Sequence, residues 1–146
     1  MNYSITKNGK PLDKKLYTFD EETKTFSSNE NNLVLDFSDI EGCTFDTGFG
    51  CTFKTGFDCT FKTSYDCTFD TGSGCTFKTS SGCTFDTGSD CVVVRRDIYE
   101  VIELKENQKI KLNGYVIKGF TILDNEPVKT NPKEITIDGA VYILKN

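Results

Sequence analysis

A cysteine recurs at every eighth position through the middle of the chain, and this spacing constrains the fold more than any other feature. All seven cysteines lie on it, and a phenylalanine follows two residues after each of the first six. The repeating unit reads C-T-F-[DK]-T-[GS]-x-[GD]. Self-similarity at a fixed period is typical of repeat architectures. The cysteines are Cys43, Cys51, Cys59, Cys67, Cys75, Cys83 and Cys91.

Each unit predicts a short strand followed by a corner. Cys and Phe alternate with Thr and a charged residue, which is the period-two pattern of a half-buried strand. The other three positions carry Gly or Ser and end in Gly or Asp, and these residues suit a tight corner. A helix does not fit, because the repeat is not a multiple of the turn of about 3.6 residues and because Thr, Phe and Gly are poor helix formers. We therefore expect an all-β chain whose coils stack as a β-solenoid.

The corner residues indicate how many units close one coil. Like charges on neighbouring stacked strands are unfavourable. With two units per coil no corner Asp lies over another, whereas with three units Asp66 would lie over Asp90. The charged strand position agrees only in part, because Lys62 would still lie over Lys78. Two-sided coils of sixteen residues are favoured, and an intertwined homotrimer with one unit per chain in each layer stays open as the alternative to a monomer.

The register extends beyond the identical units. Leu35 and Phe37 are predicted to occupy the Cys and Phe positions of one further unit upstream, and Tyr99 with Val101 to continue the pattern downstream. This predicts an N-terminal β cap at residues 1–34, the octapeptide-repeat β-solenoid at 35–98, and a C-terminal β cap or module at 99–146.

The flanking segments are expected to be β-hairpins that cover the open strand edges of the solenoid. The sequence LYTFDEETKTFSS reads as one hairpin. Two more are expected in the C-terminal segment, with tight turns at Asn113-Gly114 and Asp138-Gly139.

The cysteines are predicted to be free, buried thiols. Stacked residues lie about 4.8 Å apart, whereas a disulfide needs Cβ atoms about 3.8 Å apart. Structural zinc sites favour closely spaced cysteine pairs, and the chain has no histidine. We therefore expect no metal site and no cofactor.

Aromatic residues at some of the corners are the candidate partner contact. The seventh position of the unit is aromatic in the first three units and Ser in the next three. Either the N-terminal segment covers these side chains, or they form a patch for a partner or glycan. Where the repeat ends, Arg95 and Arg96 replace Thr-Gly, and we interpret them as the cap junction rather than an anion site. The aromatic residues are Phe49, Phe57 and Tyr65.

Composition argues against several classes of function. The absence of histidine removes the usual general base, so no catalytic residues are expected. The net charge is -5 with acids and bases interspersed, which disfavours nucleic acid and anionic lipid as partners. No apolar run approaches the roughly 20 residues of a membrane helix, so the host cytoplasm or a virion is the expected location.

The stretch CTFDTGFGCTFKTGFDCTFKTSYD resembles octapeptide-repeat proteins with tandem C-T-F-[DK]-T-G units from phage and environmental viral genomes. Phage cell-puncturing needles also use octads, but theirs are built on a Val-x-Gly unit that this chain lacks. The resemblance implies a viral origin and a structural or attachment role in a particle.

The sequence thus predicts a non-enzymatic structural or interaction protein, namely a phage-derived rigid spacer, adaptor or attachment component that contacts a protein partner or a virion. A host-directed binding module or inhibitor, including a nucleic-acid mimic, is the alternative. Ice binding is a weaker one, because a charged residue interrupts every outward threonine ladder.

Overall fold

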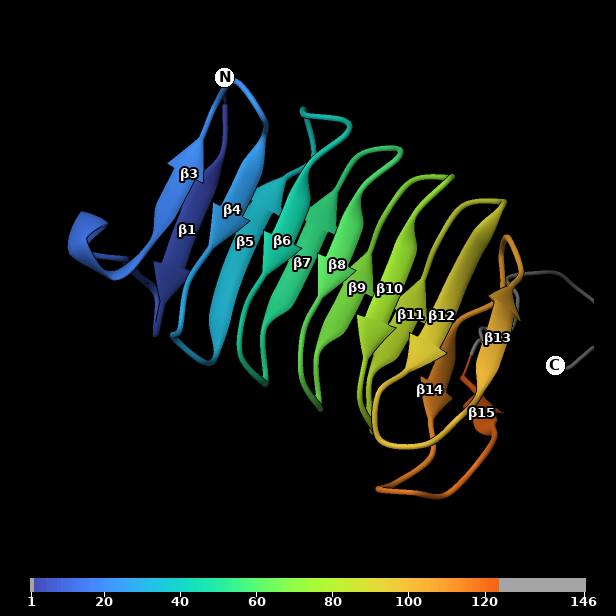
Figure 1. The fold of residues 1–146 in the computed structure, drawn as a ribbon. Coiled ribbons are helices and arrows are strands. Elements are labelled where there is room, and N and C mark those ends of the chain that lie inside the picture. Colours follow the sequence, from blue (N-terminus) through green and yellow to red (C-terminus); the bar gives the residue numbers. More distant parts are fainter. Residues whose placement is uncertain (1, 124–146) are drawn as a thin grey trace, which may run out of the picture.

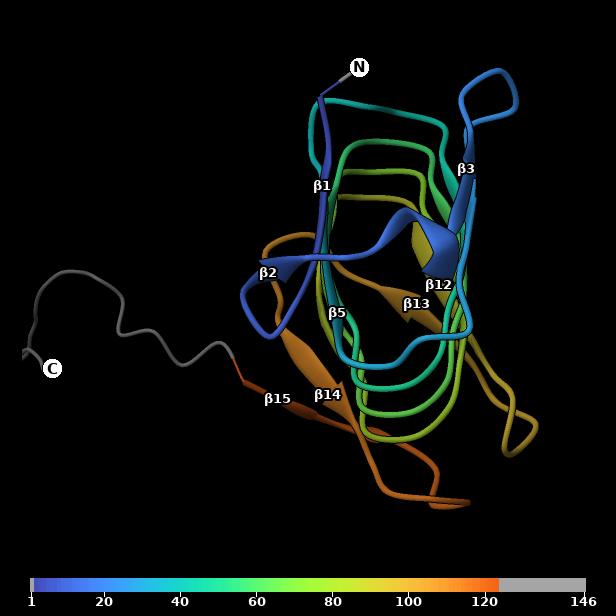
Figure 2. The same cartoon turned by 90° about the vertical axis from the view of Figure 1, so that its left-hand side faces the viewer.

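The computed structural model describes residues 2–123 and consists of two β-sheets that face each other (Figure 1). Between residues 25 and 95 the chain alternates between the two sheets, so each coil contributes one strand to each. Seen end-on in Figure 2, the coils superimpose as elongated rings with one sheet on each long side. The first sheet has the order β15 (Phe120–Ile122), β14 (Ile110–Leu112), β11 (Thr84–Asp86), β9 (Thr68–Asp70), β7 (Thr52–Thr55), β5 (Leu33–Phe37), β1 (Ser4–Lys7) and β2 (Lys10–Pro11). The second has the order β13 (Val101–Leu104), β12 (Cys91–Arg95), β10 (Thr76–Thr79), β8 (Thr60–Lys62), β6 (Thr44–Asp46), β4 (Thr25–Ser27) and β3 (Thr18–Asp20).

The predicted two-sided β-solenoid with sixteen residues per coil is confirmed. In the second sheet Thr44 lies opposite Thr60, and Thr60 opposite Thr76, in parallel register. In the first sheet Thr52 lies opposite Thr68 in the same way. Two units of one chain complete each coil, so the layers are not the one-unit-per-chain layers of an intertwined trimer.

The core is built from stacked phenylalanine rings. Within a sheet the rings of the repeat units lie nearly parallel, as for Phe45 and Phe61, whose centroids are 5.0 Å apart at an interplanar angle of 10°. Across the two sheets they meet edge to face, as for Phe53 and Phe61 at 5.1 Å and 78°. Both arrangements are favourable for aromatic pairs. Because inward-facing Cys and Phe alternate with outward-facing residues in every unit, all the repeat phenylalanines lie in one continuous interior.

The corners do alternate between Gly and Asp from coil to coil, as the two-sided coil requires. Asp58 and Gly74 lie in successive coils on one edge, with φ of 59° and 77°, which is the left-handed region. An added Cβ on Gly74 would lie 2.2 Å from Asp58 Oδ1. Steric exclusion therefore accounts for this alternation more directly than charge repulsion. Like charges do stack on the strands, because Lys62 lies opposite Lys78 and Asp70 opposite Asp86.

The upstream register predicted from the sequence is wrong by two residues. Leu35 lies opposite Phe53, and Phe37 lies opposite Thr55. The corner that follows β5 is therefore longer than the others, and it buries Ile40 at its bend. Because β5 is apolar at every second position, its sequence fits either register, and only the corner length decides between them.

The parallel stack also begins and ends at other residues than expected. It begins in KTFSS, where Phe26 of β4 lies opposite Phe45. It ends at β12, because β13 runs antiparallel to β12 with Glu103 opposite Val92. Tyr99, predicted to fill a Cys position, is instead 92% exposed. The downstream extension of the repeat is therefore wrong.

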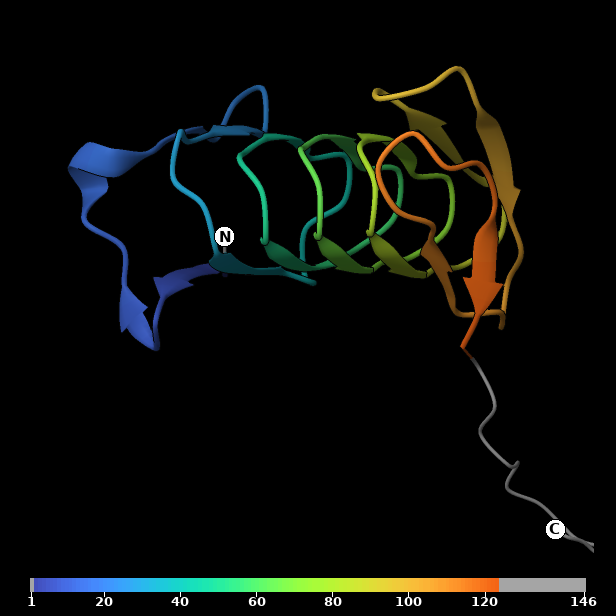
Figure 3. The same ribbon diagram turned by 90° about the horizontal axis from the view of Figure 1, so that it is seen from below.

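Hairpins cover both ends of the stack, as predicted (Figure 3). At the N-terminal end β3 and β4 form the expected hairpin, and a single 3-10 turn, η1 (Lys14–Leu16), precedes β3. The ring of Tyr3 stacks on Phe37 at 4.9 Å and closes the aromatic column. At the other end β14 and β15 pair as expected, but the tight turn at Asn113-Gly114 is wrong, because residues 113–119 form a longer loop. The turn predicted at Asp138-Gly139 lies outside the described residues.

Candidate interaction surface

The three corner aromatics do not form one patch. Phe49 and Tyr65 follow strands of the second sheet and stack on each other, with ring centroids 4.9 Å apart and an interplanar angle of 4°. Phe57 follows a strand of the first sheet and therefore lies on the opposite edge, over Gly72 of the next coil. Any contact made by all three residues at once would have to reach both edges.

The N-terminal segment covers these aromatics only in part. The backbone N–H of Phe49 donates to Asn31 Oδ1 at 3.0 Å, and Phe49 is half-buried. Phe57 and Tyr65 are 55% and 42% exposed. Two of the three rings therefore stay accessible, as two small separate patches.

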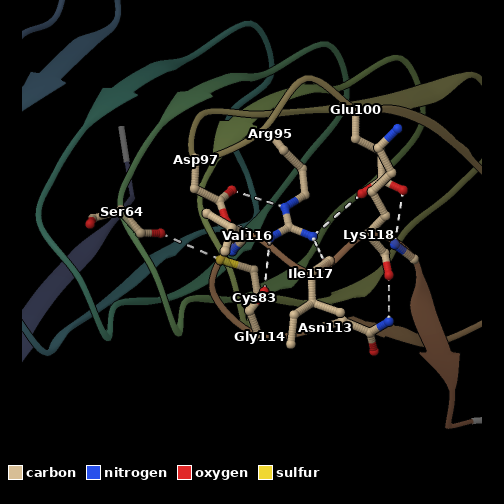
Figure 4. Close-up of polar contacts among 11 residues, drawn as sticks. Ser64, Cys83, Arg95, Asp97, Glu100, Asn113, Gly114, Val116, Ile117 and Lys118 are labelled. Carbon is tan, nitrogen blue, oxygen red and sulfur yellow. Dashed lines mark hydrogen bonds and ion pairs between the residues drawn. The ribbon is translucent and has the colours of Figure 1, made fainter.

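At the C-terminal end, Arg95 lies at the centre of a buried polar cluster (Figure 4). It occupies the interior Thr position of the repeat, opposite Thr79, and its side chain is fully buried. Nε and Nη2 donate to the two carboxylate oxygens of Asp97 at 3.0 and 2.5 Å, and Nη1 donates to Glu100 Oε1 at 3.4 Å. The remaining donors reach the carbonyl oxygens of residues 117 and 114 at 2.8 and 3.2 Å. All five guanidinium hydrogens thus have protein acceptors.

This cluster holds the loop between β14 and β15 against the last coil. Asp97 Oδ2 accepts the Val116 N–H at 2.9 Å, and Glu100 Oε2 accepts the Gly119 N–H at 2.9 Å. Burial raises the pKa of Asp97, but the hydrogen bonds from Arg95 and Val116 outweigh it and hold that pKa below its ordinary value. With its donors satisfied internally, Arg95 acts as a cap junction, which is the interpretation made from the sequence, and it offers no anion site.

Exposed apolar side chains concentrate at this same end of the molecule. They come from the segment after β12, from β13, from the 113–119 loop and from β15, and Tyr115 and Ile117 are 72% and 58% exposed. We call this set the C-terminal apolar end. It comprises Tyr99, Val101, Tyr115, Val116, Ile117, Phe120, Ile122 and Leu123. Large exposed apolar clusters mark interaction sites more often than scattered single residues do.

The strands that cover the stack at this end have no further strand paired to their outer edges within residues 2–123. β13 is the last strand of the second sheet and β15 the last strand of the first. Sequence reasoning placed a binding module here but did not select these residues. The available signal was the density of apolar residues in GYVIKGFTIL, in which Lys118 is the only charged residue and Thr121 the only threonine.

All seven cysteines are free and buried, as predicted. The hydrogen bond with the Cys75 thiol, together with burial, raises the pKa of the Cys91 thiol. The part of the chain described here holds no group of three or more His, Cys, Asp or Glu side chains arranged to bind a metal ion. None of its helices could span a membrane.

Comparison with protein-family models, with curated proteins and with solved structures finds no match to this chain. The structure itself defines the class, a two-sided all-β solenoid of octapeptide units with β-hairpin caps. The resemblance to viral octapeptide-repeat proteins stays a sequence-based expectation.

Proposed function

We propose that this protein is a non-enzymatic structural or interaction protein of phage origin, a rigid spacer or adaptor that presents its C-terminal apolar end to a protein partner in the host cytoplasm or in a virion. The observation that carries the proposal is the contrast between the two parts of its surface. The outward positions of the repeat strands are Thr, Asp and Lys, and the exposed aromatics of the repeat are confined to its corners, whereas eight large apolar side chains are exposed at one end.

The repeat suits the role of a spacer. From β4 to β12 the second sheet makes four parallel steps of about 4.8 Å, which separates the two caps by roughly 19 Å. Continuous ring stacking in the core opposes bending of the stack, because interior packing has few voids to take up a deformation. A local structural change in one cap would therefore leave the distance between the two caps unchanged.

The C-terminal apolar end suits a protein partner better than a nucleic acid. Interface cores are enriched in aromatic and aliphatic residues and depleted in charge. Tyr99 and Tyr115 offer large rigid contacts with a polar tip, a combination common in binding surfaces. The charged ladders on the sheets mix signs, with Asp46 opposite Lys62 and Lys54 opposite Asp70, which does not imitate the phosphate rows of a duplex.

The test compares two surface variants of the full chain. Tyr115→Ser with Ile117→Ser alters the C-terminal apolar end without touching the side chains of the Arg95 cluster. Phe57→Ser with Tyr65→Ser alters the corners and serves as the matched control. Both would be used as bait in a lysate of infected bacteria, and the captured proteins would be compared with the protein content of purified virions by mass spectrometry.

We expect the first variant to lose the captured partner and the second to retain it. A partner present in virions supports the particle role, whereas a host protein captured by the same surface supports the host-directed module. Capture that survives the first variant and vanishes with the second would overturn the assignment and place the contact on the array.

A further inference from the structure

Two adjoining depressions lie at the long corner that follows β5, on the same edge of the solenoid as Phe57. The first has a volume of about 270 Å³ and reaches from this corner to Phe57 in the next coil. The second has a volume of about 240 Å³ and reaches from the same corner to Tyr3 and Ser4 at β1. Ser38 and Asp39, which form the turn directly after β5, line both depressions. A ligand that crosses this turn would therefore occupy both.

The first depression offers hydrogen-bond acceptors beside an aromatic ring. A Cβ added to Gly56 would lie 2.9 Å from the Ile40 carbonyl oxygen and 3.4 Å from the Ser38 carbonyl oxygen, so the two oxygens converge on this glycine. Within residues 2–123 neither oxygen accepts a backbone hydrogen bond. Thr55 lines the same depression at 6% exposure, and its Oγ1 is buried without a hydrogen-bond partner. The ring of Phe57 is the apolar part of the lining.

Three carboxylates are distributed over the two depressions. Asp39 lines both, Glu41 lines only the first, and Asp36 lines only the second. None of the three forms an ion pair with the residues that the structure describes. They are also not close enough together to bind one metal ion, because no three acidic side chains of residues 2–123 are grouped in that way. This arrangement suits positive charges spaced along a chain better than a single compact cation.

Nearby lysines balance these carboxylates only in part. Lys24 Nζ donates to the Glu41 carbonyl oxygen at 3.1 Å, and Lys54 lies opposite Asp36 on the neighbouring strand. Three carboxylates against two ammonium groups leave one negative charge. Hydrogen bonds from the hydroxyl and the N–H of Ser38 hold the pKa of Asp36 below its ordinary value, so this carboxylate is ionised near neutral pH. The Lys24 contact shows that the rim of the first depression accepts an ammonium group.

We propose that the two depressions bind a small linear diamine or polyamine, with one ammonium group in each. An ammonium group has three N–H donors and no acceptor, which matches a lining of carboxylates, free carbonyl oxygens and one hydroxyl. The methylene groups next to the first ammonium would pack against Phe57. Both volumes are below the roughly 300–1,000 Å³ of pockets that hold drug-sized ligands, which favours a slender aliphatic chain.

This site is separate from the C-terminal apolar end. Its residues come from β1, from the corner after β5 and from the corner after β7. Amine binding and capture of a protein partner therefore test different surfaces, and either proposal can fail without the other.

The experiment titrates the isotope-labelled full chain with cadaverine at constant low ionic strength and follows the backbone amide signals by NMR. We expect saturable shifts at the N–H groups of Asp39, Glu41 and Phe57. Pentylamine has the same chain with one ammonium group, and it should bind about 2–5-fold more weakly, because it lacks one exposed ion pair. Pentanol, which has no charge, should cause no shifts at these positions.

Two isosteric variants separate the site from general charge effects. Asp39→Asn should weaken cadaverine binding by about 2–5-fold, because this carboxylate lines both depressions. Asp46→Asn removes the same charge from an exposed position on the other sheet, opposite Lys62, and should leave the binding unchanged. Both residues are exposed, so both variants should fold, and far-UV circular dichroism checks this.

Equal weakening by the two variants, or shifts spread over the whole surface, would mean that the amine acts only as a counterion and would overturn the proposal. Pentylamine binding as tightly as cadaverine would refute the second ammonium position. A blocked lysine, N-acetyl-lysine methylamide, should bind no better than pentylamine. If it bound as tightly as cadaverine, the occupant would be a lysine side chain of a protein instead of a small amine.

Discussion

Asp58 Oδ1 lies 2.2 Å from the point where a Cβ on Gly74 would be, so the two residues share one corner position in successive coils. The same relationship joins Asp66 to Gly82, again at 2.2 Å. Where an Asp side chain at this position leans over the next coil, the equivalent position of that coil must therefore be a glycine. The rule limits how the corners can be built and explains why the last position of the unit alternates.

Gly74→Ala should destabilise the protein more than Gly42→Ala. Both glycines have φ of 77°, which costs an alanine about 1–2 kcal/mol, but no atom lies within 4 Å of a Cβ at position 42. The clash with Asp58 should add about 1–3 kcal/mol, which chemical denaturation would measure. Adding Asp58→Gly to Gly74→Ala should restore the stability lost to the clash, but not the stability lost to the positive φ of the alanine. Equal losses for the two alanines would mean that the Asp58 side chain moves aside freely.

Phe69→Ala should cost roughly 3–5 kcal/mol in the free energy of unfolding, because it opens a cavity in the middle of the aromatic column. Phe69 stacks on Phe53 and Phe85 at 5.1 and 5.0 Å and is 1% exposed. Tyr99→Ala, at a site 92% exposed, is the control and should cost under about 0.5 kcal/mol. A loss below about 1 kcal/mol for Phe69→Ala would contradict the stacked core.

The repeat made the solenoid predictable because each unit carries its own strand, corner and register. One unit contains the alternation that sets the buried face and the corner residues that tolerate positive φ. Each added coil then repeats the same strand, corner and register. The chain outside the repeat lacks this redundancy, and that is where the predictions failed.

The failures share a physical cause. LVLDF is apolar at every second position, so it fits the sheet in two registers, and the length of the corner before Cys43 decides between them. Asn113-Gly114 matches a tight turn locally, but Asn113 Nδ2 instead donates to the Lys118 carbonyl at 2.7 Å and spans a longer loop. That loop is held by Arg95, eighteen residues before Asn113 in the chain. Such tertiary contacts cannot be predicted from local sequence patterns. Which residues of the C-terminal apolar end are exposed also depends on the tertiary structure, so local patterns did not predict them either.

Deleting residues 51–66 should preserve cooperative folding, because it removes one whole coil and joins equivalent corner positions. Deleting residues 51–58 removes one strand, so every later strand would have to change sheets and the C-terminal cap would meet the wrong edge. Thermal unfolding of the two deletions should therefore differ clearly, with the shorter deletion less stable. Similar midpoints would count against sixteen residues as the folding unit.

The repeat thiols should react slowly with a thiol reagent in the native protein, because six of the seven are fully buried and Cys91 is 3% exposed. After denaturation without reductant all seven should react, since all are free. Among them Cys91 should be labelled first. Counting labelled sites by peptide mass spectrometry checks both statements, and a missing pair after denaturation would reveal a disulfide.

Arg95→Met should destabilise the protein by about 3–5 kcal/mol near neutral pH, because it leaves the nearly buried carboxylate of Asp97 without its partner. In the parent the folded-state pKa of Asp97 is held below its ordinary value, so its contribution to stability is present above the unfolded pKa of about 3.9 and is lost as pH falls through the folded pKa. In the variant the contribution of Arg95 is lost and burial is opposed only by the hydrogen bonds from the backbone N–H groups of Val116 and Asp97, so the folded-state pKa of Asp97 rises above its value in the parent and protonation disfavours the folded state less. The gap in unfolding free energy between parent and variant should therefore narrow as pH is lowered from 7 toward 4. Denaturation curves at several pH values would measure this gap, and a constant gap would show that Asp97 is not the group that Arg95 compensates.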